Sequence, residues 1–392
     1  MTFNFDLSAI VISLLSLSAV AAVIVLICYV PFIRRVCSRA KECLLIVDKD
    51  SNETSDRTPA SIIIYSQGEA DRLESLLPSV LGQDYDGPFE VIVVNEGDSP
   101  DVRNVISALQ MSNRNLYLTF TPDGARSLSR KKLALTLGIK AARYPVVVQT
   151  TTDAVISSDQ WLTKILRHFN NREVGIVLGY AAPSSDITVS RRCSFDYTND
   201  SVAWLSPAIN HRPFRGSELN LAYRRELFFA NKGFSRSLNL HFGDDDIFIS
   251  EIANKTNTVV ELSPDSVIKF TSYNMASTLH DAAIRHIFTS RFIRRKPVAW
   301  LSTGEMMFWL SLLAAAAAVA LDYLNLTTII AAFIIIAVTM IFVALTWRKA
   351  TSALDMRVVS FSAPWFVLAQ PFRRIALTIY AKMSKQKKYT WD

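Results

Sequence analysis

The sequence between residues 89 and 98 reads Phe89-Glu90-Val91-Ile92-Val93-Val94-Asn95-Glu96-Gly97-Asp98. Its centre is a continuous run of β-branched residues, which is typical of a strand buried on both faces of a sheet. The run stops at a short turn that contains Glu96 and Gly97. Strands of this kind belong to parallel sheets covered by helices, so the stretch predicts an α/β domain.

The same pattern continues on both sides of this strand. Short apolar runs predict further strands at residues 61–65, 116–120 and 144–149. Apolar residues at helical spacing predict helices over residues 69–82, 100–111, 129–143 and 161–169. Strands that alternate with helices form a parallel sheet, and such sheets bind ligands at the carboxyl ends of their strands.

Acidic residues occur where a sheet of this type binds ligands. Glu96 follows one predicted strand, and Asp153 follows another in the sequence Thr150-Thr151-Thr152-Asp153. Solvation of two loops is the alternative explanation for these acids. A third acidic group, Gly243-Asp244-Asp245-Asp246, precedes an apolar helix start. Adjacent carboxylates repel one another, so this cluster indicates a metal site, a general base or a solvated loop. Together the acids suggest an enzyme that holds a metal–phosphate group and deprotonates an acceptor.

Three apolar segments, residues 8–30, 306–321 and 326–346, carry no charge. The first and third have about the length that crosses a bilayer, and the second reaches it when residues 303–305 are included. No cationic segment precedes the first, so we expect a retained anchor and not a cleaved signal peptide. Cations flank one side of the segments: Arg34, Arg35, Arg39, Lys41, Arg291, Arg294, Arg295, Lys296, Arg348 and Lys349. The positive-inside rule then predicts a multi-pass protein of a bacterial inner membrane with its large middle region in the cytoplasm.

The net charge of +7 is interpreted as attraction to anionic membrane lipids. Nucleic acid is not an expected partner, because no basic stripe with interleaved aromatic residues occurs. The four cysteines contain no C-x-x-C pair, so a disulfide framework is not expected. Residues 351–380 are apolar but contain Pro364 and Pro371. They predict an amphipathic segment at the cytoplasmic membrane surface, with a re-entrant or fourth span as the alternative.

Residues 58–300 resemble the family-two glycosyltransferases, which are inverting enzymes with a GT-A fold, in a bacterial membrane-anchored form. Residues 90–99 resemble the family's "EVIVVDDGS", and residues 150–153 fall where the family has "TDAD". Residues 216–223 followed by 243–248 resemble "G-x-N-x-A-[FY] … GDDDLF". The other similar segments are the opening strand at 61–69, the helix start at 128–135, and Arg285-His286 at the arginine end of "Q-x-x-R-W".

The resemblance implies a role for particular residues. Asp245 matches the general base, and Asp244 would raise its proton affinity. Asp153 would hold Mg²⁺ or Mn²⁺. Asp246 matches no role in the family, and we expect it to cap the following helix. The donor-binding residues would be Glu96, Lys131, Lys132 and Arg285. Two positions depart from the family pattern, since Thr151 replaces an aspartate of the metal motif and Ala282 replaces the glutamine.

The expected organisation has five parts. They are an N-terminal transmembrane helix (1–33), a juxtamembrane linker (34–57), a GT-A domain with a mainly parallel, Rossmann-like sheet (58–300), two transmembrane helices (301–347), and an interfacial segment with a basic tail (348–392).

The predicted activity is membrane-bound hexosyl transfer, with inversion, from a nucleotide sugar to a lipid-linked or polysaccharide acceptor. A UDP-sugar is the expected donor. One alternative is a processive polysaccharide synthase, for which three spans would require an oligomer. Another is a catalytically silent, glycosyltransferase-like scaffold in a membrane complex, which Thr151 and Ala282 favour.

Overall fold

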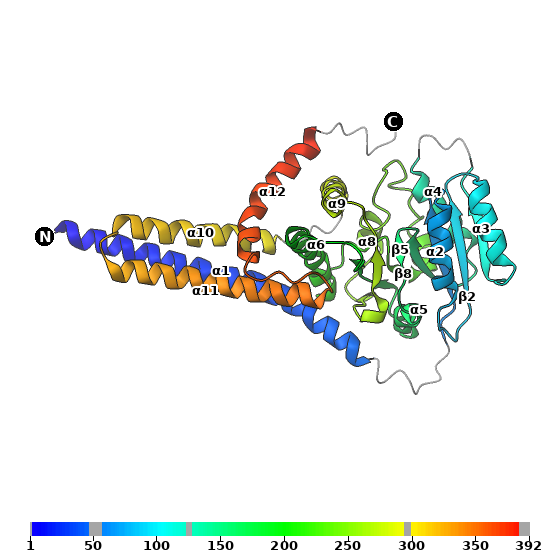
Figure 1. Cartoon of the computed structure of the whole chain (residues 1–392), viewed down its shortest axis with the longest axis horizontal. Coiled ribbons are helices and arrows are strands. Elements are labelled where there is room, and N and C mark those ends of the chain that lie inside the picture. The colour runs from blue at the N-terminus through cyan, green and yellow to red at the C-terminus, as the bar shows by residue number, and fades with distance from the viewer. Residues whose placement is uncertain (1, 47–56, 123–127, 294–298, 384–392) are drawn as a thin grey trace. The chain divides into compact units, whose positions relative to one another are not determined.

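The computed structural model describes residues 2–46, 57–122, 128–293 and 299–383 (Figure 1). The expected cations Arg294, Arg295 and Lys296, and the tail beyond residue 383, lie outside these ranges. The chain forms two compact units. The α/β unit comprises Ser38–Thr188, Pro207–Lys296 and Tyr380–Asp392, and the helical unit comprises Met1–Cys37, Val189–Ser206 and Pro297–Ile379.

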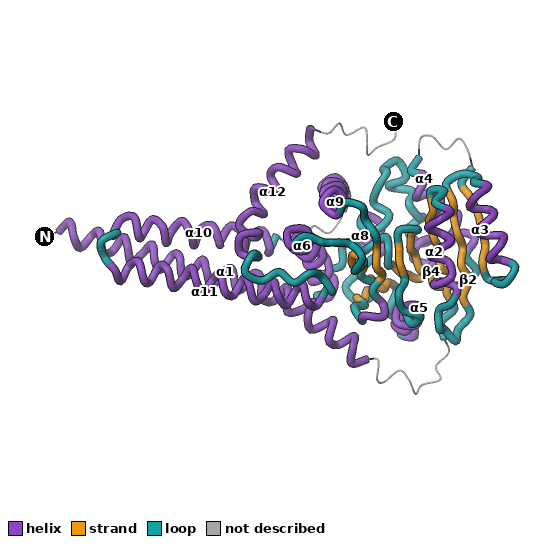
Figure 2. Tube along the Cα trace, viewed as in Figure 1, coloured by secondary structure: helices purple, strands orange, loops and turns teal. Residues whose placement is uncertain are grey.

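The α/β unit is built on a seven-stranded sheet with the order β3-β2-β1-β4-β8-β6-β9. Figure 2 shows the strands of this unit in orange. Its strands are β1 (Ala60–Ser66), β2 (Phe89–Asn95), β3 (Leu116–Phe120), β4 (Val146–Thr151), β6 (Ile176–Leu178), β8 (Leu221–Arg224) and β9 (Thr258–Val260). Strands β1 to β4 pair in parallel, and β8 runs antiparallel to β4 and β6. A second sheet has the order β5-β10-β7, from β5 (Ala154–Val155), β7 (Ala181–Pro183) and β10 (Ile268–Phe270).

The α/β unit also contains seven described helices, of which α3, α4 and α7 contact the large sheet. They are α2 (Ala70–Leu81), α3 (Pro100–Gln110), α4 (Arg130–Ala141), α5 (Trp161–Leu166), α7 (Arg225–Ala230), α8 (Ile247–Ile252) and α9 (Met275–Thr289), with short 3₁₀ turns at η3 (Arg167–Asn170) and η4 (Pro264–Ser266). Strands β1 and β4 are buried along their whole length, as predicted from their continuous apolar runs. Helix α4 packs closely on the sheet at Gly138, where a Cβ atom would lie 2.7 Å from Val94 and 2.9 Å from Ile63.

Strand order places the strand-end acids at one edge of the sheet. β1 lies between β2 and β4, with Tyr65 in register with Val94 and Thr151. Parallel strands end at the same edge, so the residues that follow β2 and β4, Glu96 and Asp153, are brought to one side of the α/β unit.

The helical unit contains α10 (Trp300–Leu321), α11 (Leu326–Ala353) and most of α1 (Thr2–Leu45), α6 (Arg191–Ile209) and α12 (Ala363–Met383). Helices α1, α10 and α11 are long and apolar enough to cross a membrane. The fully buried indole of Trp347 packs against the rings of Tyr29 and Phe195, whose centroids lie 6.1 and 4.7 Å away.

The structure differs from the expected boundaries in two places. Residues 34–45, expected to be linker, continue helix α1, because they contain no glycine or proline to stop it. Residues 189–206, expected within the domain at 58–300, belong to the helical unit. There Phe195 packs on Trp347, and Asp196 accepts a 2.6 Å hydrogen bond from Gln370.

Helix α12 occupies the segment that was expected to lie at the membrane surface. Its exposed apolar side chains include Trp365, Phe372, Ile375 and Ile379. Their spacing places them along one face of the helix, which is the pattern of an amphipathic helix. Its location at a membrane interface stays a prediction.

A buried carboxylate next to β9 should make the stability of the α/β unit depend on pH. Glu261 accepts hydrogen bonds from Arg167 (2.7 Å) and from His168 (2.6 Å). Burial would raise the pKa of Glu261, but His168 and Arg167 outweigh burial and lower that pKa from 4.5 to about 2. The carboxylate therefore stabilises the fold above pH 4.5, and this stabilisation is lost as the pH falls toward 2.

We expect Glu261 to contribute on the order of 3 kcal/mol to this acid-induced loss of unfolding free energy. The measurement is thermal unfolding of the detergent-solubilised chain between about pH 5 and pH 2. Glu261→Gln should be less stable at the higher pH and should lose less stability on acidification. Parallel pH curves for the two proteins would contradict the prediction.

Candidate active site

A cavity of about 450 Å³ opens at the carboxyl ends of β1, β2 and β4. It is lined by Tyr65, Gln67, Glu69, Glu96, Ser129, Arg130, Lys131, Thr151, Thr152, Asp153, Glu218, His241, Phe242 and Arg285. The predicted site residues Glu96, Lys131, Asp153 and Arg285 are therefore brought together. Both acidic and basic side chains line the cavity, which indicates a site for a polar, charged ligand.

Glu96 is held in place by Tyr65 of β1, which in turn contacts Gln67 just beyond the end of that strand. The hydroxyl of Tyr65 donates a hydrogen bond to Glu96, and the side-chain amide of Gln67 donates to the Tyr65 hydroxyl over 2.8 Å. Burial, followed by the hydrogen bond to Glu96, raises the pKa of Tyr65 above its usual range. Tyr65 therefore stays a hydrogen-bond donor, and it orients the Glu96 carboxylate at the wall of the cavity.

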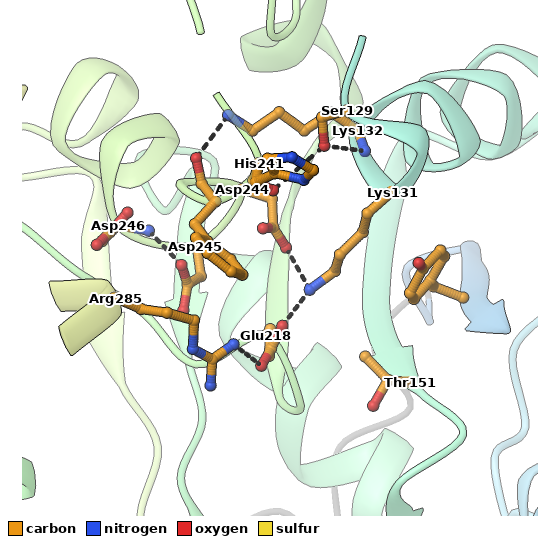
Figure 3. A network of polar contacts seen from close by, with 12 residues as sticks. Ser129, Lys131, Lys132, Thr151, Glu218, His241, Asp244, Asp245, Asp246 and Arg285 are labelled. Carbon is orange, nitrogen blue, oxygen red and sulfur yellow. Dashed lines mark hydrogen bonds and ion pairs between the residues drawn. The ribbon is translucent and has the colours of Figure 1, made fainter. Parts of the chain in front are cut away.

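Two adjacent lysines at the start of α4 point to different places (Figure 3). Lys131 pairs with Asp244 over 2.8 Å and also with Glu218, inside the cavity. Lys132 is fully buried, and its amino group donates to the backbone carbonyls of Ser237 (2.7 Å) and Phe242 (2.8 Å). Neighbours on a helix are about 100° apart around its axis, so only one of the pair can face the cavity.

The sequence-based assignment of Lys132 to donor binding is thus corrected by its position. Its amino group also donates to the Ser237 hydroxyl (3.0 Å), so three acceptors surround it within the protein. Burial lowers the pKa of Lys132 to about 8, although the charge of Asp244 opposes the shift. Lys132 ties the start of α4 to the segment 237–242, which leads into the acidic cluster.

The three adjacent acids have three different environments. Asp244 is buried and pairs with Lys131. Asp245 is half-buried, and its carboxylate accepts a 2.9 Å hydrogen bond from the backbone N–H of Asp246. Gly243 makes the preceding turn with φ = +106°, a conformation in which any other side chain would be strained.

Asp246 is a structural residue. It is the N-cap of α8, where its side chain accepts the N–H of Ile247 over 2.7 Å, as the sequence predicted. It also accepts a hydrogen bond from the hydroxyl of Thr289, and the ring of His286 lies 3.5 Å away. These contacts join α8 to α9 behind the cavity.

The surroundings separate the proton affinities of Asp245 and Asp246. Burial, followed by the charges of Asp246 and Asp244, raises the pKa of Asp245 well above its ordinary value. Burial also acts on Asp246, but the hydrogen bond and charge of His286 outweigh it and lower the pKa of Asp246. A carboxylate with raised proton affinity suits a general base, whereas one with lowered proton affinity suits a permanent acceptor.

Glu218 is a cavity residue that the sequence reasoning did not assign. It precedes β8 and pairs with Lys131 of α4 and, over 3.4 Å, with Arg285 of α9. The charge of Lys131 is the main reason that the pKa of Glu218 lies well below its usual range. The sequence signal for Glu218 was its place in the motif at residues 216–223, two residues after Gly216.

Asp153 is the best candidate for a cation ligand. Within the described ranges no three His, Cys, Asp or Glu residues gather in a way that could hold a metal ion. Mg²⁺ is commonly bound by one or two carboxylates together with ligand phosphates, so a single carboxylate is compatible with such an ion. Burial raises the pKa of Asp153, Arg72 opposes this shift, and the charges of Glu218 and Glu69 add to it.

The negative charges of Glu218 and Glu69 near Asp153 would favour the binding of a cation at this carboxylate. Arg72 of α2 now pairs with Asp153, and both side chains are about half exposed. Because this pair is accessible to water, it can exchange at low free-energy cost. Asp153 can therefore change its partner from Arg72 to an incoming cation.

Comparisons with known proteins agree with this geometry. Residues 61–239 match the family described as Glycosyl transferase family 2. The structure is similar to the mannosyltransferase PcManGT from Pyrobaculum calidifontis in complex with GDP-Man and Mn²⁺, with a TM-score of 0.53 and 18% identity over 92% of this chain and 99% of that chain. The predicted GT-A fold is confirmed.

Two further solved structures are more distant. TarS 1–349 from S. aureus in complex with UDP-GlcNAc has a TM-score of 0.43 and 14% identity, over 84% of this chain and 92% of that chain. Glucosyl-3-phosphoglycerate synthase from Mycobacterium tuberculosis, in complex with phosphoglyceric acid, has a TM-score of 0.38 and 16% identity, over 57% and 75%. No curated protein sequence matches this chain.

Proposed function

We propose that this chain, whose residues 61–239 match the family described as Glycosyl transferase family 2, transfers a sugar with inversion from a nucleotide sugar to a lipid-linked or polysaccharide acceptor. The observation that carries the proposal is that Lys131 and Arg285 line one cavity, while Lys131 pairs with the buried Asp244 and the charge of Asp245 acts on Arg285. This arrangement places phosphate-binding cations next to a carboxylate of raised proton affinity.

The donor would lie along the carboxyl ends of the strands. Lys131 and Arg285 would bind its diphosphate through charge-assisted hydrogen bonds, which are stronger than neutral ones. Glu96 would accept hydrogen bonds from the ribose or the base, in the orientation that Tyr65 gives it. A UDP-sugar is the donor that we expect.

Asp153 would hold a Mg²⁺ or Mn²⁺ ion that reaches the site with the donor. When bound, such an ion supplies positive charge to the leaving diphosphate. Thr151 stands where the family has a second carboxylate, and its hydroxyl accepts the backbone N–H of Asp153 over 3.4 Å. In this chain Thr151 therefore shapes the turn that presents Asp153.

Asp245 would accept the proton of the acceptor hydroxyl while the hydroxyl oxygen attacks the anomeric carbon. The new glycosidic bond forms on the face opposite the diphosphate, whose bond to the sugar breaks, so the anomeric configuration inverts. Asp244 would remain paired with Lys131, and its charge helps to keep the proton affinity of Asp245 high. The three candidate membrane helices support an acceptor carried by the membrane, reached from the cytoplasmic face.

The metal assignment is tested by nucleotide binding. Thermal-shift measurements of the solubilised chain with a panel of nucleotide sugars, with Mn²⁺ or EDTA, should show binding that is strengthened by Mn²⁺. Asp153→Ala should abolish the increase in nucleotide affinity that Mn²⁺ causes, which we expect to be about tenfold or more. Thr151→Asp, which restores the family pattern, should preserve or strengthen it.

Asp98→Ala is a suitable control, because Asp98 is exposed and pairs with Arg103 outside the cavity. A nucleotide affinity that is changed neither by EDTA nor by Asp153→Ala would refute the metal assignment. Donor hydrolysis by the wild-type chain separates an enzyme from the silent scaffold, and growth of a polymer from one acceptor would identify a processive synthase.

A further inference from the structure

The cations that would bind a diphosphate already share a carboxylate. Glu218 pairs with Lys131 and with Arg285, and all three side chains line the same cavity. Lys131 belongs to α4 and Arg285 to α9, so Glu218 joins two elements that are far apart in the sequence. The carboxylate therefore occupies the electrostatic position that an anionic ligand would take.

The three groups are accessible enough to exchange partners. The exposed fractions of their side chains are 17% for Lys131, 27% for Glu218 and 33% for Arg285. Asp244, the other partner of Lys131, is only 4% exposed. A ligand entering the cavity can consequently replace Glu218, while Asp244 remains on Lys131.

We propose that Glu218 is an internal substitute for the donor's diphosphate. In the empty cavity its carboxylate holds Lys131 and Arg285 together, and an entering diphosphate displaces it from both cations. The inference rests on the proposed function, because it assumes that a nucleoside diphosphate group occupies this cavity.

Such an exchange has two physical consequences. Without a carboxylate between them, Lys131 and Arg285 would repel each other in a partly buried site, so Glu218 stabilises the empty cavity, with which an entering ligand must compete. A diphosphate carries more negative charge and more acceptor oxygens than one carboxylate, so it can compete for both cations, whereas a small monoanion cannot.

The same competition would assist product release. After transfer the nucleoside diphosphate remains on Lys131 and Arg285, and Glu218 can return to these cations as the product leaves. Glu218 would therefore lower the affinity for the product, a step that often limits turnover.

The test compares Glu218→Gln with Glu69→Gln by isothermal titration calorimetry of the full chain in detergent at a fixed Mg²⁺ concentration. Glu69 also lines the cavity, but its carboxylate accepts hydrogen bonds from the N–H of Gln67 (2.7 Å) and the hydroxyl of Thr152 (3.2 Å). The probes are UDP, inorganic pyrophosphate and uridine, the last of which has no phosphate.

Glu218→Gln should bind UDP and pyrophosphate about three- to tenfold more tightly than the wild type, because the competing charge is gone. Glu69→Gln should show a clearly smaller gain, and uridine binding should be unchanged in both variants. A gain of affinity distinguishes competition from a merely structural role, since disruption of the cavity would weaken binding.

Equal or weaker binding of pyrophosphate by Glu218→Gln, or an equal gain in Glu69→Gln, would overturn the inference. A wild-type chain that binds neither UDP nor pyrophosphate would refute the donor site itself, and the inference with it. If thermal unfolding shows that Glu218→Gln does not fold, Glu218→Asp serves in its place. It keeps the charge but withdraws it by one methylene group, so it should also bind pyrophosphate more tightly.

Discussion

Asp245→Asn is expected to lower the rate of sugar transfer by about 10²–10⁴-fold, which is the usual contribution of a general base. The amide has nearly the same size as the carboxylate but cannot take the proton of the acceptor hydroxyl. UDP binding should persist, because the proposed donor contacts lie on Glu96, Lys131 and Arg285. Transfer and UDP affinity are measured on the same purified variant.

The pH dependence of transfer gives a second readout. Asp245 acts as a base only when it is deprotonated, and burial and the neighbouring acids raise its pKa. Activity should therefore fall as the pH is lowered through a value above the ordinary aspartate pKa of about 3.9. A profile of kcat against pH with its acidic limb at or below that ordinary value would contradict the assignment.

Asp246→Asn is the matched control. Asp246 is buried and accepts hydrogen bonds from Ile247 and Thr289, so its replacement should lower stability by about 1–2 kcal/mol. Transfer per folded molecule should stay close to that of the wild type. Asp245→Asn should instead lose transfer and keep its stability, because removal of a charge that its surroundings disfavour does not destabilise the fold.

Equal losses of transfer in the two variants would mean that the cluster acts as a unit. Full activity of Asp245→Asn would make Asp244 the next candidate.

Four of the seven strands of the central sheet, β1 to β4, could be predicted from the sequence because each is a short and largely apolar run, whereas β6, β8 and β9 were not predicted. The expected strands at 61–65, 89–94, 116–120 and 144–149 differ from β1, β2, β3 and β4 by at most two residues at either end. The strands β5, β7 and β10 have only two or three residues each, which is too short for a periodic signal.

The placement of α6 could not be predicted for a different reason. Its sequence carries no mark that separates it from the flanking α/β elements. It belongs to the helical unit because Phe195 packs on Trp347, more than a hundred residues later, and because Asp196 meets Gln370 of α12. Such long-range contacts are invisible in a local pattern.

In the candidate site, too, some residues could be predicted from local sequence patterns and others depend on long-range contacts. The acidic cluster and the strand-end acids could be recognised, because acids at these positions have few structural explanations. The role of Glu218 could not be recognised from the sequence, because it depends on how α4, α9 and the turn before β8 come together in the fold. Lys131 and Lys132 could not be distinguished either, because the direction of each side chain depends on how α4 is rotated against the sheet.

Lys131→Met is expected to weaken UDP binding by about 10–100-fold, the value of one or two charge-assisted hydrogen bonds. It should also destabilise the fold by about 3 kcal/mol, because buried Asp244 would lose the partner that lies 2.8 Å away. Burial would lower the pKa of Lys131, but Asp244 and Glu218 outweigh burial and raise it, so the wild-type side chain is fully charged.

Lys132→Met is the neighbouring control, and it separates binding from stability. Lys132 makes its three hydrogen bonds to Ser237 and Phe242 within the protein. Its loss should lower the unfolding free energy by about 2–3 kcal/mol, since two buried carbonyls lose their donor. The UDP affinity of the folded fraction should change by less than about threefold, because Lys132 does not line the cavity. Equal losses of UDP affinity in the two variants would show that the start of α4 acts only by holding the site together. A loss confined to Lys131→Met would support direct contact between this side chain and the diphosphate.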